Sequence, residues 1–357
     1  MNKIVTIVGA RPQFIKVSPV SQVLRESYKE ILVNTGQHYD YKMAGVFFDE
    51  LGIPKPDYDL GIGSGSHGQQ TGEMLKKIEE VLLEQRPDGV LVYGDTNSTL
   101  AGALAASKMH IPLFHIEAGL RSFNKKMPEE VNRVLTDHIS DMLFSPTETA
   151  VNNLKAENIS DHVYLVGDVM YDAVVNHSTL AEEKYAVSQF GVNEKGYYLA
   201  TIHRAENTDD PLRLSAIIKS FLQLEEDVII PIHPRTEKYI NELGLFKQIN
   251  ESKHIKLIQP VSYLEMLILE KYAKGIITDS GGVQKEAYFA KVPCYTIRDQ
   301  TEWVETIHCG WNRLVDPIKM DLSEILQKGH KSIYKENLYG DAKASNKIVA
   351  RINDFFK

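Results

Sequence analysis

The chain has 357 residues, of which 43% are hydrophobic and 25% are charged, and its formal net charge is −8. This length favours two domains, and the composition is that of a globular protein rather than a disordered or fibrous one. Because acids and bases are well mixed and the balance is acidic, we expect neither nucleic acid nor an anionic membrane as the main partner.

Short apolar runs alternate with helical patterns along the whole chain. The runs are rich in Val, Ile and Leu without alternation, which is typical of parallel strands covered on both faces. We expect strands at residues 4–8, 30–34, 89–93, 112–116, 142–145 and 163–166, and a second series at 197–202, 228–232, 255–258, 275–278 and 293–297. We expect helices at 13–25, 72–84, 99–108, 129–138, 180–190, 212–223, 263–271, 282–290 and 342–356. Strands and helices that alternate in this way predict an α/β protein with two doubly wound, Rossmann-like domains.

The least regular region, residues 167–196, separates the two series of strands. We place the domain boundary near Gly167, with a first domain at 1–167 and a second at 168–341. Ligands of doubly wound sheets bind beyond the carboxyl ends of the strands, so we expect the site in a cleft between the domains.

A few features of the sequence bear on where in the cell the protein is found. The two cysteines, Cys294 and Cys309, are too few for a disulfide framework and lack the spacing of a metal site. They fit a reducing compartment, so we expect a cytoplasmic protein. The first residues enter a strand pattern with no basic region or cleavage site before it, and we expect no signal peptide. No apolar run approaches the roughly 20 residues that span a bilayer.

The most informative segment is 278–287, Thr-Asp-Ser-Gly-Gly-Val-Gln-Lys-Glu-Ala, which joins a predicted strand to a predicted helix. Free N–H groups at the start of a helix, together with the helix dipole, favour an anion. Gly281 and Gly282 let a phosphate approach the backbone closely, and Glu286 is placed to accept hydrogen bonds from a ribose diol. The alternative is an ordinary turn with Ser280 as N-cap residue, and the motif alone favours neither.

A similar turn at residues 9–16 carries Arg11 and Lys16. We favour an anion site here over solvent-exposed bases, because it would complement the turn at Ser280.

Carboxylates occur at or near the ends of predicted strands of the first domain in three places. Asp95 fits either the N-cap residue of the helix at 99–108 or a carboxylate held for acid–base chemistry. Glu117 fits either an ion pair with Arg121 or a proton-transfer group with an altered pKa. Glu129 lies in the first turn of a helix, where the dipole alone explains an acid. Three such motifs in one domain favour a functional cluster.

His203 follows the first strand of the second domain, beside Arg204 and Glu206. A lone histidine is more often packed or capping, but this setting suits a cationic donor for a departing phosphate. Zinc-ligand spacing, a Gly-x-Ser-x-Gly motif and a Walker sequence are all missing from the chain. The residues alone therefore predict a two-domain α/β enzyme that binds a phosphorylated ligand without a metal.

Taken in order, these motifs resemble the non-hydrolysing UDP-N-acetylglucosamine 2-epimerase family. The segments that carry the resemblance are 9–12 (Gly-Ala-Arg-Pro), 36–38 (Gly-Gln-His), 94–96 (Gly-Asp-Thr), 115–121 (His-Ile-Glu-Ala-Gly-Leu-Arg), 128–133 (Pro-Glu-Glu-Val-Asn-Arg), 145–148 (Ser-Pro-Thr-Glu), 203–204 (His-Arg) and 278–282 (Thr-Asp-Ser-Gly-Gly). The resemblance implies the GT-B fold of nucleotide-sugar glycosyltransferases and glycogen phosphorylase, usually in a homodimer. It also implies a final helix, here 342–357, that returns to the first domain.

The resemblance implies inversion at C2 of a UDP-linked 2-acetamido sugar, from UDP-GlcNAc to UDP-ManNAc. UDP is eliminated to give a bound 2-acetamidoglucal and is then added back. The catalytic residues so implied are Asp95, Glu117, Glu129 and His203. The residues so implied to contact UDP and its diphosphate are Arg11, Lys16, Arg133, Arg204, Ser280, Gly281, Gly282 and Glu286. A metal or cofactor is not implied, and the expected pathway is polysaccharide biosynthesis.

The chain departs from the common family pattern in three segments. Residues 301–305 are Thr-Glu-Trp-Val-Glu where many members have Thr-Glu-Arg-Pro-Glu, residues 284–286 are Gln-Lys-Glu in place of Gln-Glu-Glu, and residues 9–13 are Gly-Ala-Arg-Pro-Gln in place of Gly-Thr-Arg-Pro-Glu. These departures resemble a branch that acts on UDP-2,3-diacetamido-2,3-dideoxyglucuronic acid, which is the alternative substrate. Further alternatives are a hydrolysing epimerase that releases ManNAc and UDP, a GT-B glycosyltransferase and a non-catalytic nucleotide-sugar sensor.

Some bacterial members require their own substrate at a regulatory site. The corresponding segments here are 37–40 and 67–70, and the arginine that follows in those members is not evident. We expect this regulation to be weak or absent.

Overall fold

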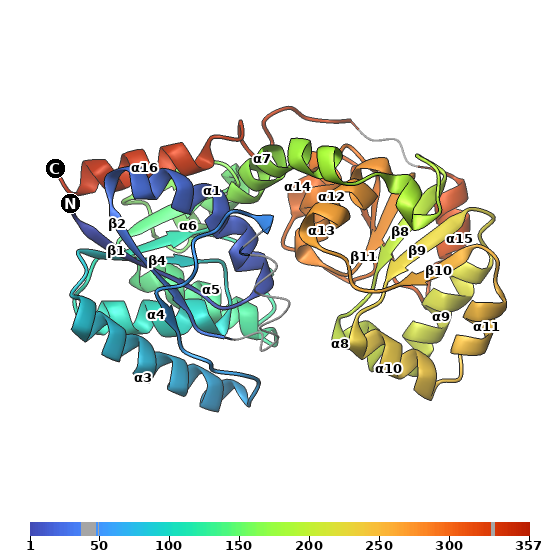
Figure 1. Ribbon diagram of the computed structural model, residues 1–357, viewed down its shortest axis with the longest axis horizontal. Coiled ribbons are helices and arrows are strands. Elements are labelled where there is room, and N and C mark those ends of the chain that lie inside the picture. Colours follow the sequence, from blue (N-terminus) through green and yellow to red (C-terminus); the bar gives the residue numbers. More distant parts are fainter. Residues whose placement is uncertain (37–47, 49, 330–332) are drawn as a thin grey trace. The chain divides into compact units, whose positions relative to one another are not determined.

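The computed structural model describes residues 1–36, 48, 50–329 and 333–357 (Figure 1). It divides into two compact units, Met1–Asn176 with Asn337–Lys357, and His177–Glu336. The division falls inside helix α7 (Val169–Lys184) rather than at Gly167. The polar helix expected at 180–190 is instead the end of α7 followed by a 3-10 turn, Val187–Phe190. The segment 37–40, named above for regulation, lies outside the described residues.

The first unit contains a seven-stranded parallel sheet with the order β3-β2-β1-β4-β5-β6-β7. Its strands are β1 (Lys3–Val8), β2 (Lys29–Asn34), β3 (Tyr58–Asp59), β4 (Gly89–Tyr93), β5 (Leu113–Ile116), β6 (Met142–Ser145) and β7 (Val163–Leu165). In register, Ile4 pairs with Glu30 of β2 on one side and with Gly89 of β4 on the other. The sequence predicted all of these strands except β3, whose two residues are too few to produce a pattern.

Helices cover both faces of this sheet. They are α1 (Arg11–Ser27), α3 (His67–Gln85), α4 (Asn97–Lys108), α5 (Pro128–Ile139), α6 (Glu148–Ala156) and α16 (Ala344–Phe355). Figure 1 shows α1 and α16 side by side on one face and α3 and α4 on the other. Successive side chains of β1 point to opposite faces of the sheet. Val5 and Ile7 point to the face covered by α3 and α4, because they belong to the same buried cluster as residues of these helices.

The C-terminal helix α16 is held against the rest of the first unit by a buried carboxylate. Asp172 accepts hydrogen bonds from the backbone N–H groups of Ala344 and Ser345 at 3.1 and 2.8 Å. At the other end of the helix, the Tyr28 hydroxyl donates to Asn353 at 2.6 Å. The tail is therefore capped by one segment of this unit and packed on another.

The second unit contains a six-stranded parallel sheet with the order β10-β9-β8-β11-β12-β13. Its strands are β8 (Tyr197–Thr201), β9 (Asp227–Pro231), β10 (Ile255–Ile258), β11 (Gly275–Thr278), β12 (Cys294–Thr296) and β13 (Asn312–Leu314). Its helices include α8 (Ala205–Thr208), α9 (Pro211–Leu222), α10 (Pro234–Glu242), α11 (Phe246–Glu251), α12 (Tyr263–Tyr272), α13 (Gly281–Phe289), α14 (Val304–His308) and α15 (Leu322–Gln327). Strand β13 was missed because its central residue, Arg313, is charged and exposed.

Both sheets are doubly wound, so each has one point at which the order of strands reverses. In the first unit this point lies between β1 and β4, and in the second it lies between β8 and β11. The loops that leave adjacent strands there run in opposite directions and leave a crevice beyond the strand ends, which is where such sheets bind ligands. Each unit therefore has one position in its fold at which a site is expected.

Candidate active site

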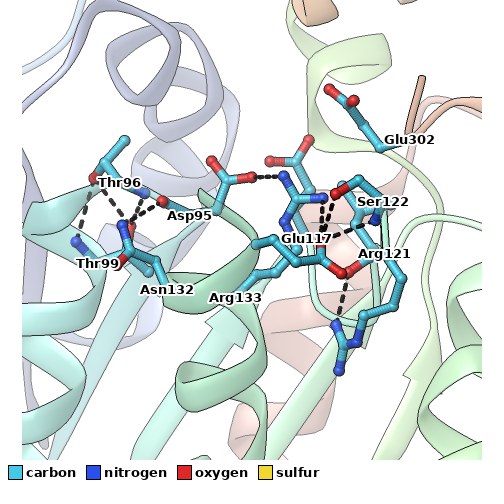
Figure 2. Close-up of polar contacts among 12 residues, drawn as sticks. Asp95, Thr96, Thr99, Glu117, Arg121, Ser122, Asn132, Arg133 and Glu302 are labelled. Atoms are coloured by element: carbon cyan, nitrogen blue, oxygen red, sulfur yellow. Dashed lines mark hydrogen bonds and ion pairs between the residues drawn. The ribbon is translucent and has the colours of Figure 1, made fainter. Parts of the chain in front are cut away.

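Asp95 lies at the reversal point of the first sheet, just beyond β4. Figure 2 shows its carboxylate in contact with Arg133 on α5. The distance from Oδ2 to the guanidinium nitrogen is 2.6 Å. Asn132 on the same helix donates to the Asp95 carbonyl at 2.9 Å. Helix α4 begins with Thr96 as its N-cap residue, so the alternative in which Asp95 caps this helix is wrong. The carboxylate is instead directed to a cation.

The surroundings of Asp95 favour its protonated form. Burial raises the pKa of this carboxyl above its usual value, and the nearby carboxylates Glu117 and Glu129 act in the same direction. Arg133 and Lys16 act against the shift but do not cancel it. A carboxyl with a raised pKa beside other acids is suited to accepting and returning a proton near neutral pH.

Glu117 follows β5 in an unusual backbone conformation. Its φ is +74°, in the left-handed region that non-glycine residues seldom adopt, and it is 7% exposed. Strain of this kind is concentrated at functional sites. Its carboxylate forms a buried ion pair with Lys16 of α1. The alternative pairing with Arg121 is wrong, because Arg121 contacts Asp137 and Glu157.

Gly94 makes room for this ion pair. Its φ is +62°, and a Cβ at this position would lie 3.0 Å from Oε2 of Glu117 and 3.4 Å from Nζ of Lys16. A side chain here would therefore strain the backbone and crowd both partners. A glycine directly before Asp95 therefore leaves space for the ion pair between Glu117 and Lys16.

The two acids at the start of α5 have different environments. Glu130 is 3% exposed and accepts hydrogen bonds from the N–H groups of Ser122 and Phe123, each at 2.8 Å. It therefore holds the loop before the helix. Glu129 is half-buried and contributes to the raised pKa of Asp95. Of the pair, Glu129 is the one whose charge acts on Asp95.

The turn at residues 9–16 is closed by Gln13, one of the positions at which the chain departs from the family pattern. Gln13 accepts hydrogen bonds from the N–H groups of Gly9 and Ala10 at 2.8 and 3.0 Å, and it donates to the Tyr93 carbonyl at 2.8 Å. These two N–H groups are therefore satisfied within the protein, contrary to a backbone anion site at this turn. Arg11 is half-buried at the first position of α1.

His203 lies at the reversal point of the second sheet, just beyond β8. Its Nδ1 is 3.1 Å from Oδ1 of Asp279, which follows β11 and is fully buried. Asp279 also accepts hydrogen bonds from the Arg204 N–H and from Asn207, both at 3.0 Å. Although burial opposes it, these contacts, with that of His203 foremost, lower the pKa of Asp279. Because the ionised Asp279 accepts, Nδ1 of His203 carries the proton, and Nε2 is left for a ligand.

Asp279 was not assigned a function from the sequence. The sequence pattern instead emphasised Arg204 and Glu206, which both follow His203 in the chain. The signal that could have identified Asp279 is its position directly after a central strand, at the same level of the sheet as His203.

Helix α13 begins at Gly281, one residue before the predicted start, and Ser280 occupies its N-cap position without a side-chain capping hydrogen bond. A Cβ on Gly281 would lie 2.7 Å from Oε1 of Glu302, so the glycine permits this carboxylate to approach the first turn. Arg298 holds the same carboxylate at 3.2 Å. An acidic group thus lies beside the helix start that was predicted to bind an anion. Gly282 lies in the same first turn, and Glu286 lies one turn further on, buried.

Two of the three departures from the family pattern meet in space. The ammonium group of Lys285 lies 3.9 Å from the centre of the Trp303 ring, and both side chains are at least nine-tenths buried. This is the geometry of a cation–π contact. Where common members have a glutamate and an arginine, this chain therefore has a cation and an aromatic ring in contact.

Within the part of the chain that the structure describes, no group of three or more His, Cys, Asp or Glu side chains is arranged to hold a metal ion. No helix of the described segments is long and apolar enough to span a membrane.

Comparison with known proteins supports a single family. Residues 22–353 match the family model described as UDP-N-acetylglucosamine 2-epimerase. The chain is 58% identical over 350 residues to a UDP-N-acetylglucosamine 2-epimerase homolog of Methanococcus maripaludis, covering 97% of this chain and 98% of the relative. It is 50% identical over 361 residues to the UDP-2,3-diacetamido-2,3-dideoxy-D-glucuronate 2-epimerase of Pseudomonas aeruginosa, again covering 97% and 98%.

Solved structures agree with the sequence relatives. The crystal structure of Methanocaldococcus jannaschii UDP-GlcNAc 2-epimerase in complex with UDP-GlcNAc and UDP superposes with a TM-score of 0.92 at 46% identity, covering 99% of each chain. A structure from Neisseria meningitidis, bound to UDP-GlcNAc, has a TM-score of 0.89 at 32% identity and covers 99% of this chain and 100% of its own. The two parallel sheets are therefore those of the GT-B-like fold, and the chain belongs to the UDP-N-acetylglucosamine 2-epimerase family.

Proposed function

We propose that this protein catalyses the C2 epimerisation of UDP-GlcNAc to UDP-ManNAc without a metal or cofactor. The observation that carries the proposal is the acid cluster of the first unit. Asp95, which has a raised pKa, and Glu117, which is strained, each contact a cation just beyond two adjacent strands, β4 and β5. Inversion of a carbon centre by proton transfer needs one acid–base group on each face of the sugar, and this cluster provides more than one carboxylate.

In the proposed reaction one carboxylate of the set Asp95, Glu117 and Glu129 removes the proton at C2. The C1–O bond to the diphosphate breaks as the C1–C2 double bond of the glycal forms. UDP then attacks C1 again, and a second acid of the set returns a proton to the opposite face of C2. Atoms and charges balance without an oxidant, so no redox cofactor is required.

The second unit stabilises the leaving diphosphate in this proposal. Asp279 fixes Nδ1 of His203, so that Nε2 is presented to the departing oxygen. Arg11, Lys16, Arg133 and Arg204 provide positive charge, of which Lys16 and Arg133 contact the catalytic acids in the structure. The nucleotide is bound by Ser280, Gly281 and Gly282 at the start of α13, with Glu286 on the ribose.

One observation favours a second substrate, UDP-2,3-diacetamido-2,3-dideoxyglucuronic acid. Lys285 and Trp303 both depart from the common family pattern, and Trp303 contacts Lys285 on α13, the helix that binds the nucleotide in this proposal. The relative of that specificity is among those that match nearly the whole chain. The same acid cluster would act on either sugar, since the chemistry at C2 is shared.

Proton NMR in D2O tests the proposal directly. With UDP-GlcNAc, we expect a new UDP-ManNAc anomeric signal and deuterium at C2. Free UDP with free ManNAc would identify a hydrolysing epimerase instead. If a folded sample that binds UDP leaves UDP-GlcNAc unchanged and epimerises the diacetamido-uronate, then the second substrate is correct. If it changes neither sugar, the proposed function is wrong.

The resemblance also supports a homodimer that acts in the cytoplasm and supplies precursors of a polysaccharide. Light scattering of the purified protein distinguishes a dimer from a monomer.

A further inference from the structure

His115 is a buried histidine for which the reaction proposed above has no direct use. It lies on β5 with no exposed surface. Its Nδ1 is 2.7 Å from Oδ1 of Asp137 on α5, and its Nε2 is 2.8 Å from the carbonyl oxygen of Gly94, which follows β4. The ring therefore bridges three separate segments of the first unit.

The two partners determine where the protons are. A carbonyl oxygen only accepts, so Nε2 of His115 must carry a proton. The contact at Nδ1 also requires a proton, which is held either by the ring or by Asp137. In both arrangements the His115–Asp137 pair is neutral as a whole and contains one more proton than a neutral histidine with an ionised aspartate. Loss of that proton would leave the Asp137 carboxylate facing the lone pair of Nδ1 of His115, which is a repulsive contact in the protein interior.

Asp137 extends the contact to the loop that follows Glu117. Its Oδ2 accepts hydrogen bonds from Arg121 at 2.6 Å and from the N–H of Gly119 at 3.1 Å. Arg121 in turn forms a two-point ion pair with Glu157, with distances of 2.6 and 2.8 Å. The positive charge of Arg121 is thus balanced within the network, which gives each buried polar group a partner.

Each of the three segments that His115 and Asp137 join carries one of the proposed catalytic acids. Gly94 directly precedes Asp95, His115 and Gly119 lie two residues on either side of Glu117, and the helix of Asp137 has Glu129 in its first turn. We propose that His115 and Asp137 are positioning residues, which fix the spacing of Asp95, Glu117 and Glu129 through the buried bridge between β4, β5 and α5. The inference rests on the proposed function, because it assigns the pair to the alignment of these acids.

Packing alone does not require this arrangement. Buried ionic pairs cost desolvation, and apolar side chains of similar volume are often as stable or more stable. Geometry at a reacting centre, in contrast, is sensitive to displacements of about 1 Å, which reduce turnover by about 100-fold. A bridge that is costly to bury and that ends beside three acids is therefore better explained by alignment than by stability.

The test compares His115→Gln with a matched control, His138→Gln. His138 follows Asp137 on α5 and contacts a carboxylate of the same network, Glu157, at 2.9 Å, but its side chain is 46% exposed. For His115→Gln we expect kcat to fall by about 100-fold while KM and the Kd for UDP change by less than about 3-fold. For the control we expect kcat within about 2-fold of the wild type. A folded His115→Gln protein with wild-type kcat would overturn the inference.

A double variant separates positioning from general stability. If His115 acts through the acids, adding His115→Gln to Asp95→Asn should lower kcat by much less than the product of the two single effects. Effects that multiply fully would overturn the inference. If His115→Gln does not fold, Asp137→Asn takes its place in both measurements, since it retains the shape of the side chain.

An activity-free measurement distinguishes failure of the inference from failure of the proposed function. If the wild type epimerises no UDP-sugar, the proposed function fails, and the titration of Asp95 followed by 13C NMR tests the bridge by itself. We expect His115→Gln to move the midpoint of this titration and His138→Gln to leave it unchanged. An unmoved midpoint in His115→Gln would overturn the inference.

Discussion

The two units have the same topology at their reversal points but opposite electrostatics. Beyond β4 of the first unit, burial and neighbouring carboxylates raise the pKa of Asp95. Beyond β11 of the second unit, the contact with His203 lowers the pKa of Asp279 although that carboxylate is fully buried. One unit therefore makes an acid ready to exchange a proton, and the other uses an acid as a permanent anion that orients a histidine. A shared fold position predicts where a site lies, but the neighbours of each carboxylate decide its chemistry.

The largest expected effect comes from neutralising the acids of the first unit. Asp95→Asn and Glu117→Gln should each reduce kcat by about 10²–10⁴-fold, because a proton-transfer group is lost. UDP affinity, measured by calorimetry, should remain within a few fold. Glu242→Gln, at an exposed position, is the control. A comparable loss of UDP affinity in both variants would assign these residues to structure or binding.

Asp279→Asn tests the opposite use of a carboxylate in the second unit. The amide no longer provides an anion to hold the Nδ1 proton of His203, so the ring is free to take another tautomer or orientation. We expect kcat to fall by about 10²–10³-fold. Asp316→Asn, another carboxylate of this unit that contacts a base, is the matched control. If Asp279→Asn retains activity while His203→Asn loses it, the orienting function of Asp279 is excluded.

Arg133→Met sharpens the comparison through the dependence of rate on pH. Arg133 is the principal opposing influence on the raised pKa of Asp95, so its removal should raise that pKa further. If Asp95 must be ionised to act as a base, the acidic limb of kcat/KM against pH then moves to higher pH. Arg351→Met, at an exposed position on α16, should leave the limb in place. A shift to lower pH would contradict the assigned electrostatics.

The smallest effect on activity is expected outside both clusters. Asp172→Ala removes the carboxylate that accepts the first N–H groups of α16 and should lower the free energy of unfolding by about 1–3 kcal/mol. Urea unfolding measures this change, with Asp354→Ala at the exposed end of the same helix as control. The kcat of the folded variant should match the wild type. A large fall in kcat with unchanged stability would show that α16 affects the active site.

The sequence by itself determined the class of fold and the positions of most elements. Buried strands such as β4, β6 and β11 were predicted with the bounds that the structure shows, because continuous apolar runs between turns have few other solutions. The family was also recognisable, since motifs that follow strand ends recur in one order along the chain. Short or charged elements such as β3 and β13 have too few apolar residues to be found in this way.

The tertiary structure alone decided which charge faces which. Lys16 and Glu117 are 101 residues apart in the chain, and Asp279 and His203 are 76 residues apart. The sequence suggested a local partner for Glu117, Arg121, because neighbours in the chain are the only neighbours that a pattern reveals. Parallel sheets place strand ends side by side through long crossovers, so the contacts that set a pKa form between residues with no fixed separation in sequence.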